Sequence, residues 1–152
     1  MSRKRRHDYA MHLEFLGYAC KWQRDGWLYA IHPVRWNFFL LPVEGGVRFH
    51  CSISIGLLSD QKRTAALEFL NQANQRTVLA RFTLEYEAAF GCHFIRARTF
   101  LQGEEYERSE FGMWMDLWHT DLESLRGGPW AETDDEEGDE ESEQTRAPST
   151  VN

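Results

Sequence analysis

The sequence has few of the residues that mark a disulfide-stabilised or membrane-spanning protein. Its 152 residues contain three cysteines, Cys20, Cys51 and Cys92, and no CxxC pair. An odd number of widely spaced cysteines indicates reduced thiols in a cytosolic protein. The longest apolar run, around FFLLPV, is far shorter than the roughly 20 residues that cross a bilayer. No apolar segment follows the basic N-terminus, so we expect no secretory signal and a cytoplasmic protein.

Motifs of the common enzyme classes are also missing. The sequence has no GxSxG, HExxH, P-loop or GxGxxG pattern. The adjacent pairs His50–Cys51 and Cys92–His93 would suggest a metal site if their strands were neighbours. Adjacent strand residues point to opposite faces, however, so each pair is expected to divide between core and surface. We therefore predict no catalytic residue, no metal site and no cofactor, with Cys51 as a small core residue.

A net excess of positive charge is present only in a short N-terminal cluster. The chain has a net charge of −7. Residues 127–152 carry nine acidic side chains and one basic, residues 3–6 carry a net +4, and residues 7–126 carry a net −3. A slightly negative body argues against broad electrostatic binding to nucleic acid, so no nucleic-acid partner is predicted.

The two ends are predicted to lie outside the folded body. We expect residues 1–6 to be a basic disordered head and residues 127–152 an acidic disordered tail, around a single domain at 7–126. Within the tail, Trp130 is the residue that could pack back on the domain. An open alternative to a solvated head is that its basic residues pair with the acidic tail of the same chain or of a second subunit.

The body is rich in aromatic residues, with ten Phe and five Trp, and its hydrophobic periodicity changes along the chain. Apolar residues at spacings of three and four predict helices over 6–16, 59–74 and 106–125. Alternating residues predict hairpins that turn at Asp25-Gly26 and at 44–46, and a further strand pair after 77.

This pattern predicts an α+β fold. The expected order is α-β-β-β-α-β-β-α, with an antiparallel sheet of four to five strands and helices packed on one face. The clearest strand follows the second hairpin turn, where apolar and polar side chains alternate over residues 47–55. At the junction between the second helix and the next strand, Asn74 is interpreted as a stop signal and Asn71 as a neighbour that faces solvent or tethers the loop.

The order of elements, with the junction at LNQAN, resembles the YbjN-like family, whose fold is similar to type III secretion chaperones. The resemblance covers residues 7–126 and rests on the combined order of several short segments. It implies a small protein-interaction or regulatory domain, commonly dimeric, without a defined catalytic apparatus. The segments are FLGY, GGVRFHCSISIG, LNQAN, LARFTLEY and SEFGMWM.

Our functional hypothesis is therefore a non-enzymatic, cytoplasmic bacterial domain that forms a homodimer and binds an unidentified protein partner. Four aromatic residues are predicted as interface residues, with burial in the core as the competing interpretation: Trp36, Phe38, Trp114 and Trp118. The alternative function is a small-ligand sensor or an enzyme, with a pocket between helix and sheet lined by His50, Arg96 and Arg98.

Overall fold

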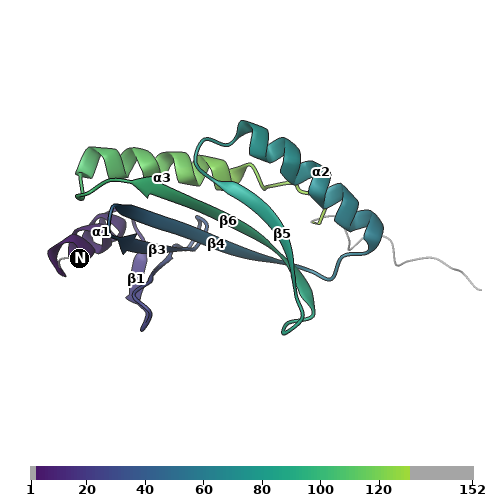
Figure 1. The fold of residues 1–152 in the computed structure, drawn as a ribbon, viewed down its shortest axis with the longest axis horizontal. Coiled ribbons are helices and arrows are strands. Elements are labelled where there is room, and N and C mark those ends of the chain that lie inside the picture. The colour runs from purple at the N-terminus through teal and green to yellow at the C-terminus, as the bar shows by residue number, and fades with distance from the viewer. Residues whose placement is uncertain (1–2, 131–152) are drawn as a thin grey trace, which may run out of the picture.

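A computed structural model describes residues 3–130 and shows an α+β fold with one antiparallel sheet (Figure 1). Four strands precede the second helix, and one hairpin separates it from the third. The helices are α1 (Arg3–Phe15), α2 (Asp60–Arg76) and α3 (Arg108–Glu123). The strands are β1 (Ala19–Trp22), β2 (Leu28–Ile31), β3 (Phe38–Val43), β4 (Gly46–Gly56), β5 (Arg81–Glu87) and β6 (Cys92–Gln102).

The α+β class is confirmed, but the predicted strand count of four to five was one too low. The sheet has six strands in the order β1-β2-β3-β4-β6-β5, so the chain reads α-β-β-β-β-α-β-β-α. The two hairpins predicted before the second helix already contain four strands, and the predicted order counted only three of them. The predicted turn of the first hairpin is present: Gly26 has φ +89°, and Asp25 accepts a hydrogen bond from the Trp27 amide.

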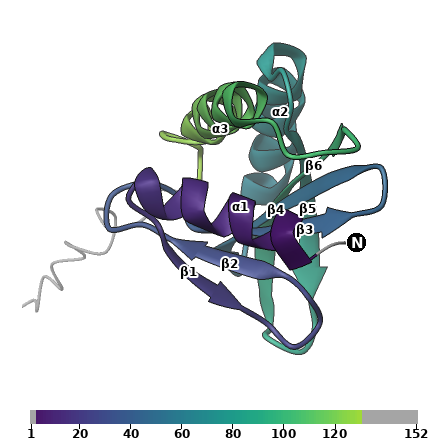
Figure 2. The ribbon, with the colours of Figure 1, turned by 90° about the vertical axis from the view of Figure 1, so that its left-hand side faces the viewer.

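All three helices pack on the same face of the sheet. Figure 1 shows α2 and α3 above the strands, and Figure 2 shows α1 beside α3. The Phe111 ring of α3 lies 5.0 Å from that of Tyr9 on α1, and Trp118 lies 5.4 Å from Phe49 on β4. The helix stripe predicted for α3 is fully buried, and so is the inward half of β4 from Val47 to Cys51. These contacts make one continuous core between the sheet and the helices.

The predicted disordered head differs from the structure, because α1 already begins at Arg3. The Arg5 guanidinium donates hydrogen bonds to the carbonyl oxygens of Val43 at 3.2 Å and Gly103 at 2.8 Å. Arg6 lies over the Trp22 ring, 5.8 Å from its centre. These basic residues are thus held by carbonyls and an aromatic ring that are distant in the sequence.

The junction after α2 also differs from its predicted role. The helix continues past Asn74 to Arg76, and Thr77 is its cap residue. The Asn74 amide group donates to the carbonyl of Phe82 at 3.0 Å and accepts from its N–H at 2.8 Å. Both bonds occupy the outer edge of β5, so Asn74 acts as a short substitute for a neighbouring strand.

The loop between α2 and β5 is fixed by a buried acid that the sequence did not single out. Asp121 on α3 accepts hydrogen bonds from three consecutive amides, those of Val78, Leu79 and Ala80, at 2.6–3.0 Å. Because these amides turn inward toward one carboxylate, β5 begins only at Arg81, later than the predicted strand.

The described chain ends where Trp130 packs its ring 5.1 Å from that of Phe69 on α2. The predicted docking of Trp130 is therefore confirmed. Most of the predicted acidic tail, residues 131–152, lies outside the described residues. Within 3–130, no helix has the length and apolar character needed to span a membrane.

Candidate functional site

The helices leave the other face of the sheet without a covering layer, and we call it the open face. Inward side chains of β4 and β6 are buried, whereas the residues between them point outward and are half-buried or exposed. Directly paired residues of antiparallel strands share a face, so the strand register identifies the residues of the open face.

One row of the open face crosses the whole sheet and takes one residue from each strand. Adjacent members of the row are direct partners in the register of each strand pair. The row has basic residues at both ends and aromatic rings, including an imidazole, in the middle. In spatial order it consists of Lys21, Tyr29, Phe39, His50, Arg98 and Arg81.

The middle of this row, Tyr29, Phe39 and His50, forms an aromatic cluster together with Trp27. The Tyr29 and Phe39 rings are stacked, with centroids 4.5 Å apart and planes at 18°. The Trp27 ring stands 6.3 Å from that of Phe39 and 6.2 Å from the His50 imidazole. We call these four residues the aromatic cluster; they form an apolar area on a face that helices do not cover.

Two shallow hollows flank the cluster, and Trp27 and His50 line both. One hollow, of about 680 Å³, lies toward the first hairpin and is also lined by Phe39. The other, of about 400 Å³, lies toward Arg48 and Arg98. Both are open to solvent, so they suit an extended chain or a flat surface better than an enclosed small molecule.

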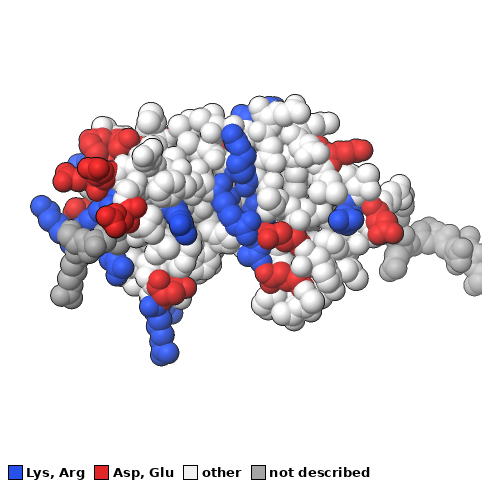
Figure 3. Space-filling view, in the orientation of Figure 1, with Lys and Arg blue, Asp and Glu red and all other residues white. Residues whose placement is uncertain are grey.

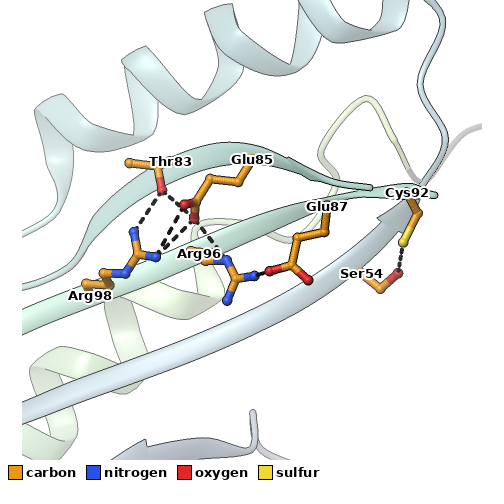
Figure 4. A network of polar contacts seen from close by, with 7 residues as sticks. All are labelled: Ser54, Thr83, Glu85, Glu87, Cys92, Arg96 and Arg98. Atoms are coloured by element: carbon orange, nitrogen blue, oxygen red, sulfur yellow. Dashed lines mark hydrogen bonds and ion pairs between the residues drawn. The ribbon is translucent and has the colours of Figure 1, made fainter. Parts of the chain in front are cut away.

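The β5–β6 half of the open face carries a network of ion pairs (Figure 4). Arg96 pairs with Glu85 at 2.9 Å and also with Glu87, and Arg98 pairs with Glu85 at 3.1 Å. The side chains come from two adjacent strands, and Thr83 adds a weak hydrogen bond from Arg98 at 3.4 Å. The Arg98–Glu85 pair is exposed and adds little stability by itself, whereas the Arg96 side chain is mostly buried. Glu85 is shared by both guanidinium groups and orients them.

His50 sits between the aromatic cluster and these arginines. Burial, followed by the nearby Arg98 and Arg96 charges, lowers the pKa of His50 below its usual value. The imidazole is therefore mainly neutral near pH 7, and it adds an aromatic surface without adding positive charge.

The structure places the predicted ligand-pocket residues together, but not where the sequence suggested. His50, Arg96 and Arg98 all lie on the open face, so the pocket predicted between helix and sheet is wrong. Arg96 is engaged by two carboxylates, and only His50 and Arg98 line a common hollow. The reason is strand alternation, because the inward positions between them are taken by residues such as Ala97.

Three of the four aromatic residues predicted at an interface are inside the domain. Phe38, Trp114 and Trp118 are at most 7% exposed and belong to the core, so a partner cannot contact them in this packing. Trp36 is half-buried, with the Arg126 guanidinium 5.8 Å from its ring centre. The competing interpretation, burial in the core, is therefore correct for Phe38, Trp114 and Trp118. Trp36 retains some accessible surface.

The cysteine–histidine pairs divide between the two faces as expected. Cys51 is buried, and burial raises the pKa of its thiol to about 12. His93 is also buried and accepts a hydrogen bond from the Leu58 amide, whereas His50 and Cys92 point to the open face. Among residues 3–130, no three His, Cys, Asp or Glu side chains gather in a metal-binding arrangement.

The aromatic cluster and the cross-strand row were not predicted as a site from the sequence. The signal that could have identified the cluster was the alternation of side chains in β2 and β3. It places Tyr29 and Phe39 on the face opposite to Leu28 and Leu40. To predict the row, the strand order must also be known, because β4 pairs with β6 although α2 and β5 lie between them in the sequence.

Comparison with known proteins shows similarity only at the level of structure. No family model matches the sequence, and no curated protein matches it either. The crystal structure of YbjN, a proposed transcription regulator from E. coli, superimposes with a TM-score of 0.58 and 9% identity, over 82% of this chain and 88% of that one. An uncharacterised protein from Methanothermobacter thermautotrophicus gives a TM-score of 0.58 at 11% identity, over 79% and 93% of the two chains. The protein therefore has the YbjN-like fold that its order of elements suggested.

Proposed function

We propose that this protein is a non-enzymatic protein-interaction domain, chaperone- or regulator-like, that uses the open face to bind a segment of a partner protein. The observation that carries the proposal is the aromatic cluster on a helix-free sheet face, flanked by two solvent-open hollows. Interface cores are enriched in aromatic residues and arginine, and both are present here. The regulator description of YbjN is consistent with such a role.

The aromatic cluster supplies the apolar contact that a partner segment would bury. Its rings are already fixed by stacking and edge contacts, so little side-chain entropy is lost on binding. The surrounding arginines are oriented by Glu85 and can donate to backbone carbonyls or acidic side chains of the partner.

We further propose that the protein acts as a homodimer through α1 rather than through the open face. Met11 and Phe15 are 54% and 74% exposed on this helix, and both line a hollow with Tyr106 and Arg108. Large apolar side chains grouped in this way commonly mark an interface between subunits. A dimer through α1 leaves both open faces available for partners.

Sedimentation velocity of the full chain tests the dimer. We expect wild type to sediment as a dimer at micromolar concentration and the Phe15→Ser variant as a monomer, because the most exposed apolar anchor is lost. Val34→Ser, which removes an equally exposed apolar side chain in the β2–β3 loop, is the matched control and should remain dimeric. A wild-type monomer at all concentrations would rule out the dimer without affecting the open-face proposal.

A further inference from the structure

The open face has an excess of positive charge. Figure 3 shows Lys and Arg side chains in a band across the middle of the molecule, with acidic side chains beside it. The strand registers place five basic side chains on this face against Glu85 and Glu87. Within residues 3–130, neither Arg48 nor Arg81 forms an ion pair with a carboxylate. The basic residues are Lys21, Arg48, Arg81, Arg96 and Arg98.

The same chain contains a segment of opposite charge. Nine acidic residues lie between Glu132 and Glu143, with Arg146 the one basic residue after Trp130. The negative charge of this segment is opposite in sign to the excess positive charge of the open face, so the two are electrostatically complementary. Residues 7–126 carry only a net −3 and residues 3–6 a net +4, so the acidic charge is concentrated in this segment.

The position and length of the segment allow it to reach the open face. The Trp130 ring packs against α2, which fixes the point from which the following 22 residues start. An extended chain of that length spans about 70 Å, whereas a domain of this size is about 35–40 Å across. Covalent attachment gives such a segment an effective concentration in the millimolar range, so even a weak contact is populated.

We propose that residues 131–152 bind in cis to the basic residues of the open face and compete there with the partner. The contact is electrostatic, with carboxylates on Arg48, Arg81 and Arg98, and is therefore weakened by salt. A partner must displace the segment before it reaches the aromatic cluster. The segment therefore lowers the apparent affinity of the open face for that partner. This regulation rests on the proposed function, because it takes the open face as the binding surface.

Nuclear magnetic resonance of the full chain tests the contact without any partner. The wild type is compared with a full-length variant in which the nine acidic residues from Glu132 to Glu143 become Asn or Gln. At about 20 mM salt we expect amide shift differences on β4, β5 and β6, and we expect them to vanish at about 0.5 M salt. A synthetic peptide of residues 131–152, added to the neutralised variant, should shift the same signals saturably.

Two double variants locate the site. Arg48→Gln with Arg81→Gln should reduce the open-face shift differences by at least half, whereas Arg63→Gln with Arg76→Gln, on exposed positions of α2, should not. Unchanged α3 signals show that each variant is folded. Cis binding would be overturned if the shift differences were absent or lay on other elements. It would also be overturned if they grew with protein concentration, because the segment would then bind a second copy of the chain. None of these outcomes depends on whether an external partner binds the open face.

Discussion

Among single residues, the buried carboxylate of Asp121 has the largest expected effect on stability. It is the shared acceptor for three consecutive amides of the α2–β5 loop, and it ties that loop to α3. Nothing in the sequence marks it, because an Asp on the apolar side of a helix can be recognised only once its distant donors are known. The same holds for Arg5, whose carbonyl acceptors are 38 to 98 residues away.

We predict that Asp121→Ala lowers the free energy of unfolding by about 3–5 kcal/mol, because each unsatisfied buried amide costs about 1–3 kcal/mol. Chemical denaturation of the full chain measures this change. Asp116→Ala, at an exposed position of the same helix, should change stability by no more than about 0.5 kcal/mol. A loss below about 1 kcal/mol for Asp121→Ala would show that the loop amides have other acceptors.

Three histidines should make the fold less stable in mild acid. Burial lowers the pKa of His12, His50 and His119, with further lowering by nearby arginines. The unfolded chain therefore takes up protons on these imidazoles at a higher pH than the folded chain does. Stability is fully present above the unfolded pKa of about 6.5 and falls as the pH decreases through it.

The measurement is the free energy of unfolding between pH 7.5 and 5.5. We expect a decline toward acid in wild type and a shallower decline in His50→Gln, which removes one of the three groups. An unchanged slope in His50→Gln would show that neither burial nor the nearby arginines lower the pKa of His50 in the folded chain.

At the scale of elements, periodicity predicted what local sequence can determine. The alternation of β4 predicted its buried residues from Val47 to Cys51, and the spacing of apolar residues predicted α3 itself, because each element is long enough to repeat its pattern several times. The same spacing did not decide whether Trp114 and Trp118 lie in the core or at an interface. The start of β5 was predicted too early, because a tertiary contact with Asp121 fixes the preceding loop.

The outer edge of β5 is protected from pairing with another chain by Asn74, and this protection is easily tested. Asn74→Ala leaves the outer N–H and C=O of Phe82 without their present partner, so we expect a loss of about 1–2 kcal/mol and faster aggregation. Thermal unfolding and light scattering measure the two effects. Asn71→Ala removes an exposed asparagine one turn earlier and should leave both unchanged. Equal behaviour of the two variants would mean that α2 shields the edge without the Asn74 amide.

At the scale of the whole molecule, the important feature is the contrast between the two faces of one sheet. Three helices cover the inner face with a continuous core, and the outer face presents a row from Lys21 to Arg81. The sequence predicted a sheet with helices on one face and a protein partner. It could not identify the residues, because the row is assembled from six strands whose order is set by the tertiary fold.

The most direct test of the open-face proposal compares partner capture by three full-length proteins in extracts of the native cell. The Tyr29→Ser, Phe39→Ser variant removes the stacked pair of the aromatic cluster, and Met11→Ser, Phe15→Ser removes two exposed apolar residues on α1. We predict that proteins captured by wild type are retained by the α1 variant and lost by the open-face variant, with affinity for the identified partner at least tenfold weaker. An open-face variant that is folded and captures the same proteins with unchanged affinity would contradict the proposal.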